Sequence, residues 1–348
     1  MNAAHPPIFN FKFSILKKFS IIVPVYNRID EVRDLADSLL RQTTDNFELI
    51  LVEDGSTQPC DKVAEEVRAK GLDVKYYFKE NEGRSIARNY GIERSEGEWL
   101  IFFDSDCVIP PTYFEELEKQ TVSQPLDCYG GPDAAHESFS NTQKAISYTM
   151  TSFLTTGGIR GGKVSLEKFT PRTFNMGFRR KVYNKVGGFR EMFSEDIDMS
   201  TRIRQAGFSI GLYPDLAVWH KRRVSWGKFW RQVHVFGMSR ITLQLLYPGS
   251  MKAVHWLPAI AVILGITLIL LGIFVSPWWM LPLGLYLAAV VIMAFAVTRS
   301  PIIAVKALPA AVIQLGGYGT GFIRAYFTKI ILRRSRDVQQ EIEMRRGK

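Results

Sequence analysis

The chain of 348 residues contains little cysteine, with three residues, and little histidine, with five. Cys60, Cys107 and Cys128 are odd in number and lack the spacing of metal ligands. This pattern argues against a disulfide framework and against a zinc site, and it fits a reducing compartment. The sequence also lacks internal repeats and low-complexity segments, which argues against repeat architectures and biased tails.

The N-terminal segment lacks the apolar centre of a cleaved signal peptide. Residues 10–20 mix phenylalanine with Lys12, Lys17 and Lys18. We therefore expect a mature membrane protein in which residues 1–18 form an interfacial segment.

Long apolar runs are present near the C-terminus, at Ala253–Val275 and Pro277–Val297. Apart from Tyr286, their only ionisable side chain is His255. Each run is long enough to cross a hydrocarbon layer of about 30 Å at about 1.5 Å per helical residue. A soluble core helix is seldom apolar on every face, so both runs are predicted to be transmembrane helices.

The net charge of +10 is concentrated on either side of the apolar region. The basic residues concerned are Lys221, Arg222, Arg223, Lys228 and Arg231 before it, and Arg324, Lys329, Arg333, Arg334, Arg336, Arg345, Arg346 and Lys348 after it. Both clusters are expected on the cytoplasmic side, which predicts two full crossings, a cytoplasmic catalytic domain and a basic tail over 333–348. No nucleic-acid reader motif is present, so anionic lipid headgroups are the expected partner of this charge.

A third apolar segment, Ile302–Phe327, carries Lys306, Pro309 and several glycines. These residues predict a segment that lies in the membrane interface or dips in and returns, inside a membrane region over 241–332.

Residues 19–240 alternate strand and helix patterns. Strands are predicted at 19–26, 47–52, 74–78 and 99–103, and apolar residues at helical spacing follow each of the first three. This order predicts an α/β domain with a mostly parallel sheet and helices on both faces. Ligands of such sheets bind beyond the carboxyl ends of the strands, where polar residues gather in this sequence.

Two carboxylates, Asp104 and Asp106, follow the apolar run Trp99–Phe103. Residues two apart in an extended chain point the same way, so both can face one ligand. A hard divalent cation prefers such oxygen donors and also takes phosphate oxygens. The alternative, a strand followed by an acidic turn, is the more frequent meaning of an isolated Asp-x-Asp.

A second acidic cluster, Glu195, Asp196 and Asp198, begins a predicted helix that ends at Gly207. Acids in a first helical turn stabilise the helix dipole without any other purpose, although three of them exceed what capping requires. Downstream, a short strand is predicted over 214–218 and is followed by His220, and a lone histidine is more often structural than a ligand.

Five segments, in this order and spacing, resemble family 2 glycosyltransferases, an inverting group with the GT-A fold. They are Pro24–Arg28, Val52–Ser56, Asn81–Gly91 with its Ala87-Arg88-Asn89, Asp104-x-Asp106, and Glu195-Asp196. The resemblance covers residues 19–240.

The resemblance implies a donor site for a nucleotide sugar. Pro24 and Tyr26 would pack around the base and Asp54 would hydrogen-bond it, although Glu53 replaces the aspartate that usually precedes Asp54. Arg84 and Arg88 would approach the nucleotide.

The resemblance also implies a metal site and a catalytic base. Asp104 would reach the ribose or the metal, Asp106 would bind Mg²⁺ or Mn²⁺ on the diphosphate, and His220 would lie near it. Asp196 matches the family's catalytic base, while Glu195 and Asp198 would orient the acceptor or the helix.

The expected function is a membrane-bound inverting glycosyltransferase that moves a sugar from a nucleotide-sugar donor to a lipid-linked, polyprenyl-linked or glycan acceptor in glycan or glycolipid biosynthesis. Two alternatives remain: a processive polysaccharide synthase and a catalytically silent membrane scaffold. The processive members carry Gln-x-x-Arg-Trp, which Gln232–Phe236 does not match. Trp226 and Trp230 share a helix face and suit either an interfacial anchor or a sugar platform, the anchor being favoured.

Overall fold

The computed structural model describes residues 18–134, 139–156, 169–220 and 225–332. Its main sheet has seven strands in the order β3-β2-β1-β4-β8-β6-β9. The strands are β1 (Phe19–Val25), β2 (Phe47–Asp54), β3 (Val74–Lys79), β4 (Trp99–Phe102), β6 (Cys128–Gly130), β8 (Met176–Arg179) and β9 (Ile210–Leu212). The first four are mutually parallel and β8 is antiparallel to its neighbours β4 and β6, so the predicted mostly parallel sheet is confirmed.

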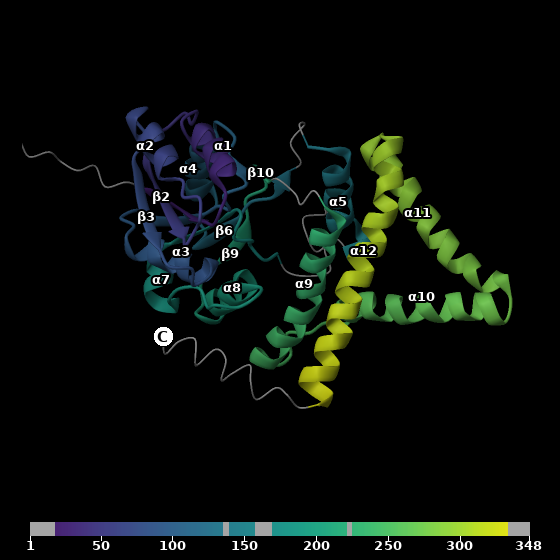
Figure 1. The fold of residues 1–348 in the computed structure, drawn as a ribbon. Helices are drawn as coiled ribbons and strands as arrows, with labels where there is room; N and C mark the ends of the chain where they lie inside the picture. The colour runs from purple at the N-terminus through teal and green to yellow at the C-terminus, as the bar shows by residue number, and fades with distance from the viewer. Residues whose placement is uncertain (1–17, 135–138, 157–168, 221–224, 333–348) are drawn as a thin grey trace, which may run out of the picture.

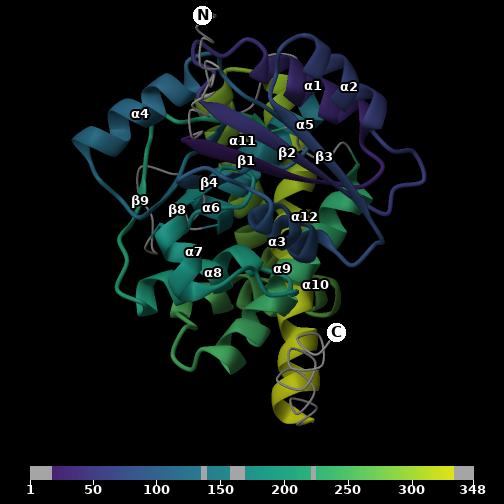
Figure 2. The same cartoon turned by 90° about the vertical axis from the view of Figure 1, so that its left-hand side faces the viewer.

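Helices cover both faces of this sheet (Figure 2). One face carries α1 (Ile29–Leu39), α2 (Asp61–Ala69) and α4 (Tyr113–Ser123), and the other carries α3 (Arg84–Glu93), α7 (Arg180–Val186) and α8 (Glu195–Gln205). Each helix buries one apolar stripe, as Val32, Leu35 and Leu39 of α1 show. Strands β1 and β2 are buried on both sides, which explains their nearly continuous apolar sequences.

A small second sheet lies beside the acidic turn that follows β4. It consists of β5 (Cys107–Val108), β10 (Val218–His220) and β7 (Asp133–Ala134). The prediction of a strand over 214–218 is wrong, because β10 begins only at Val218 and Pro214 lies in a turn. Proline lacks the N–H that a strand ladder needs, and its fixed φ favours a turn.

The C-terminal part is helical and projects away from the sheet (Figure 1). Its helices are α9 (Trp226–Leu246), α10 (Leu257–Phe274), α11 (Leu281–Thr298) and α12 (Pro301–Tyr326), with α5 (Asn141–Thr151) and α6 (Phe153–Thr156) packed nearby. Ala253–Phe274, Pro277–Thr298 and Pro301–Ile331 are long and apolar enough to cross a membrane. The first two coincide with the predicted spans. The predicted boundary after residue 240 falls inside α9.

The third apolar segment does not dip in and return, so that form of the prediction is wrong. It forms one continuous helix, α12, that accommodates both features expected to break it. Lys306 donates a hydrogen bond to Thr142 Oγ1 at 2.8 Å, and Pro309 lies within the helix. The interfacial segment over 1–18, except Lys18, and the basic tail over 333–348 lie outside the described residues.

Helices α9 and α12 approach so closely that glycine is required where they meet. A Cβ on Gly237 would lie 2.1 Å from the Tyr318 carbonyl oxygen, and one on Gly321 would lie 2.0 Å from the His234 carbonyl oxygen. Neither contact can relax by moving a side chain, because both involve backbone atoms. The two glycines therefore fix how α12 packs against α9.

We expect Gly237→Ala to lower the thermal stability of the full chain, since overpacking of this kind costs about 1–3 kcal/mol. The measurement is the melting temperature of the purified protein in detergent micelles. Gly227→Ala is the matched control on the same helix, because a Cβ there meets nothing within 4 Å. Equal melting temperatures for the two variants would contradict the close approach.

Candidate active site

The end of β1 presents an exposed aromatic ring. Tyr26 is 52% exposed, and Pro24 is half-buried beside Val52 of β2. Asn27 adopts φ +52°, and its side-chain oxygen accepts a hydrogen bond from Thr57 N at 2.9 Å. The turn after β1 is thereby tied to the turn after β2. Packing of Pro24 and Tyr26 around a nucleotide base stays a prediction.

Asp54, at the end of β2, is buried and holds the start of α3. Its carboxylate accepts hydrogen bonds from Glu82 N at 3.0 Å and Gly83 N at 2.9 Å, and it pairs with Lys79 at 2.8 Å. Gly83, at φ +100°, permits the turn into the helix. Asp54 therefore sets where Arg84 begins α3. The predicted hydrogen bond from Asp54 to a nucleotide base stays a prediction.

Arg88 joins the two acidic motifs that are distant in the sequence. Its guanidinium is 1% exposed and donates to Asp104 Oδ1 at 2.8 Å and to Glu195 Oε1 at 3.0 Å. Arg84, one helical turn earlier, pairs with Glu195 Oε2 at 2.8 Å. Glu195 is thus buried between two arginines, an arrangement that suits positioning better than proton transfer. The structure brings Arg84, Arg88, Asp104 and Glu195 together directly.

Asp104 and Asp106 occupy a tight turn. Strand β4 ends at Phe102, and Cys107 N donates to the Asp104 carbonyl oxygen at 3.1 Å, which closes the turn. The prediction that an extended chain points both carboxylates at one ligand is therefore wrong, because the two residues lie in a turn. Asp104 remains 34% exposed despite its bond to Arg88.

These two carboxylates fit an open Mg²⁺ or Mn²⁺ site better than a closed one. No group of at least three His, Cys, Asp or Glu side chains that could hold a metal occurs within the described part of the chain. Mg²⁺ is commonly held by one or two carboxylates together with substrate phosphates and water, so a third protein ligand is not required. The backbone of His220 pairs with Cys107, next to Asp106, and its side chain lies outside the described part.

Asp196 follows Glu195 at the start of α8 and is held by an arginine. Arg172 donates to Asp196 Oδ2 at 3.1 Å, and Ile197 N donates to Oδ1 at 2.8 Å. Burial raises the pKa of the Asp196 carboxyl, but the charge and hydrogen bond of Arg172 outweigh it, so the pKa lies below its ordinary value. Asp196 is therefore ionised at neutral pH, as a general base must be.

The start of α8 has a residue in a strained backbone conformation and is held by buried hydrogen bonds and ion pairs. Ser194 adopts a left-handed φ of +65° and shares a hydrogen bond with Ser239 of α9 at 2.8 Å. Asp198 is fully buried and bonded to Arg190, Arg202 and the Tyr247 hydroxyl, so it orients the helix. Sequence reasoning missed Arg172, because it lies 24 residues before Asp196 in a stretch without periodic signal.

Comparison with known proteins identifies this architecture. The glycosyl transferase family 2 model matches residues 20–187. An uncharacterized glycosyltransferase of Rickettsia bellii is 43% identical over 103 residues, covering 30% of this chain and 14% of that protein. Glycosyltransferase GlyA of Streptococcus pneumoniae is 37% identical over 110 residues, covering 32% and 16%. The chain thus spans less than a fifth of the length of either relative.

A solved structure shares the fold along most of the chain. The mannosyltransferase PcManGT from Pyrobaculum calidifontis, in complex with GDP-Man and Mn²⁺, superposes with a TM-score of 0.54 at 15% identity, covering 91% of this chain and 88% of that one. The sheet with its flanking helices therefore has the GT-A fold. Residues 20–187 thus match the glycosyl transferase family 2 model, and three helices long and apolar enough to span a membrane follow them.

Proposed function

We propose that the chain is a membrane-bound inverting glycosyltransferase that moves a hexose from a nucleotide-sugar donor to a lipid-linked or polyprenyl-linked acceptor at the cytoplasmic face. The observation that carries this proposal is the buried Arg88, which bonds both Asp104 of the metal-binding turn and Glu195, the neighbour of Asp196. The residues assigned to the sugar donor and those assigned to the sugar acceptor are thereby held at one edge of the sheet.

Different residues of the chain would act on the nucleotide-sugar donor and on the acceptor. Asp104 and Asp106 would hold Mg²⁺ or Mn²⁺, which when bound neutralises charge developing on the leaving diphosphate. Arg84, whose side chain is 52% exposed, would offer a positive charge to the same diphosphate. Asp196 takes the proton of the acceptor hydroxyl as that oxygen attacks the sugar carbon from the face opposite the leaving group, which inverts the anomeric centre.

The experiment that tests this function is a screen of common nucleotide sugars with the full chain and Mn²⁺, scored by released nucleoside diphosphate. Release or transfer with one of them is expected. Absence of release with every donor would favour the catalytically silent scaffold. Products longer than one added sugar would favour the processive synthase.

We expect Asp106→Ala to weaken metal-dependent donor binding at least tenfold, a free-energy loss of about 1.4 kcal/mol. The measurement is nucleoside diphosphate affinity with and without Mn²⁺. Asp73→Ala is the control, since that exposed carboxylate precedes β3 at the opposite edge of the sheet. Affinity that does not depend on Mn²⁺ in the unmodified protein would show that the metal assignment is wrong.

A further inference from the structure

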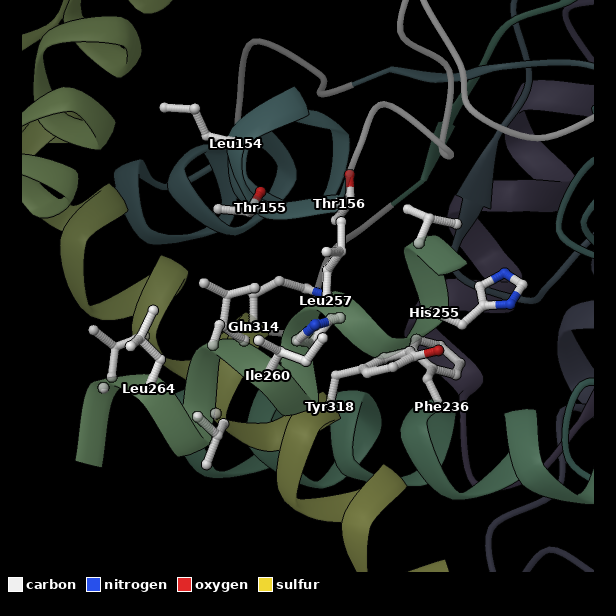
Figure 3. A pocket seen from close by; sticks show the side chains of 18 of the residues that line it. Leu154, Thr155, Thr156, Phe236, His255, Leu257, Ile260, Leu264, Gln314 and Tyr318 are labelled. Carbon is white, nitrogen blue, oxygen red and sulfur yellow. The ribbon is translucent and has the colours of Figure 1, made fainter. Parts of the chain in front are cut away.

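A large cavity lies among the C-terminal helices and reaches the start of α8. Its volume is about 830 Å³, near the upper end of the roughly 300–1,000 Å³ typical of ligand pockets. It is bounded by α6, α9, α10, α11 and α12, and Figure 3 shows Leu257 and Ile260 of α10 facing Thr155 and Thr156 of α6 across it. Sequence reasoning assigned no role to this space.

The walls contributed by the candidate membrane helices are mostly apolar. They include Leu257, Ile260 and Leu264 of α10, Leu283 of α11 and Leu315 of α12. In Figure 1, α10 and α11 extend away from α12 and meet at the turn between them, so this part of the cavity belongs to the membrane region. A hydrocarbon chain entering from a bilayer would meet matching apolar surface there.

The other end of the cavity reaches residues beside the candidate catalytic base. Arg172, Ser194 and Ile197 line it, and these are residues that hold or flank Asp196. Arg172 bonds the Asp196 carboxylate directly. One continuous space therefore runs from the candidate membrane helices to the residues that hold or flank the group that would deprotonate an acceptor.

One wall residue is a buried polar side chain whose oxygen lacks a hydrogen-bond donor within the described residues. Gln314 of α12 is only 8% exposed, and its side-chain oxygen has no hydrogen-bond partner within the described residues. Figure 3 shows this side chain in the cavity, near Ile260. A buried carbonyl oxygen without a donor costs free energy, which a hydroxyl or N–H brought by a bound molecule would recover.

We propose that the cavity holds the hydrocarbon chain of the acceptor, a lipid whose hydroxyl-bearing head emerges beside Asp196. The proposal rests on the proposed function and adds where the hydrocarbon chain of the acceptor lies and the path it takes to the catalytic residues. The occupant is a lipid because the cavity extends from the candidate membrane helices to the residues beside Asp196. Its head carries a hydroxyl because Asp196 would accept a proton and Gln314 offers an acceptor oxygen.

The test is photo-crosslinking of the full chain in phosphatidylcholine nanodiscs. The probe is dodecyl glucoside with a diazirine at the end of its alkyl chain, and labelled residues are located by mass spectrometry. Labels are expected on cavity-lining residues such as Leu264 and Leu283. A dodecane that carries the same diazirine should label these residues at least tenfold less, because it brings no hydroxyl.

Two glycines provide a matched pair of variants on the membrane helices. Gly265 lines the cavity and Gly284 does not, and a Cβ at either position meets nothing within 4 Å, so both have room for a side chain to start. Gly265→Leu should reduce cavity labelling at least tenfold, while Gly284→Leu should stay within twofold of the unmodified chain.

Three outcomes would overturn the proposal: equal labelling in both variants, equal labelling by the dodecane probe, or labels confined to outward-facing residues such as Ile292. The crosslinking needs no donor, and the donor screen needs no lipid probe. Failure of the cavity proposal and failure of the glycosyltransferase proposal are therefore separate results.

Discussion

Replacing Asp196 by asparagine is expected to reduce sugar transfer by about 10²–10⁴-fold, the usual contribution of a general base. The amide has nearly the same shape but cannot accept a proton. Donor affinity should stay within twofold, because the side chain bonds Arg172 and Ile197 rather than the turn that carries Asp104 and Asp106. The measurements are the initial rate of product formation and the affinity for nucleoside diphosphate with Mn²⁺.

The matched control for this variant is Arg172→Gln. Both substitutions break the ion pair between Arg172 and Asp196, but only Asp196→Asn removes the carboxylate. Arg172→Gln should raise the pKa of the Asp196 carboxyl, because burial is then less opposed, so its transfer activity should recover as the pH is raised, whereas that of Asp196→Asn should not. Normal turnover by Asp196→Asn would remove Asp196 from its role, and equal losses in both variants would show that the ion pair, rather than the base, matters.

The fold of the catalytic domain could be predicted because its signals are local. A buried parallel strand is apolar along its whole length, and an amphipathic helix repeats every 3.6 residues, so β2 and α1 can be recognised from their own residues. Polar residues after the first, second and fourth strands then indicate the ligand edge. The positions of Asp54 and Asp104 follow from this pattern.

The arrangement of the acidic residues could not be predicted in the same way. Asp104 and Glu195 are 91 residues apart, and their connection depends on a third residue, Arg88, whose burial is a property of the packed structure. Arg172 likewise gains its role only when the chain before β8 folds back onto α8. No sequence pattern predicts either set of contacts.

The sequence mispredicts the third apolar segment because the residues expected to interrupt its helix make tertiary contacts instead. Lys306 bonds Thr142, and the glycines of α12 admit close neighbours instead of interrupting the helix. A Cβ on Gly319, for example, would lie 2.5 Å from the Pro258 carbonyl oxygen of α10. Composition alone cannot separate glycine that bends a helix from glycine that lets another helix approach.

Replacing Arg88 by methionine is expected to destabilise the catalytic domain by about 3–5 kcal/mol, because a buried carboxylate loses its counter-charge. Glu195 is 3% exposed and would be left with Arg84 alone, while Asp104 would lose a partner at 2.8 Å. At about 2–4 °C per kcal/mol for a domain of this size, the melting temperature of the full chain in detergent should fall by roughly 6–20 °C.

Arg84→Met separates the effect of burial from that of charge. Arg84 lies on the same helix and pairs with the same Glu195, but its side chain is 52% exposed, so its loss should cost only about 0–1 kcal/mol. Arg84 instead offers its charge to the diphosphate, so this variant should lose donor affinity while it keeps its melting temperature.

Adding Glu195→Gln to Arg88→Met should recover part of the lost stability, because the buried negative charge of Glu195 is then removed. Equal melting temperatures for Arg84→Met and Arg88→Met would contradict the buried link. In that case the donor and acceptor sides would owe their alignment to the backbone rather than to Arg88.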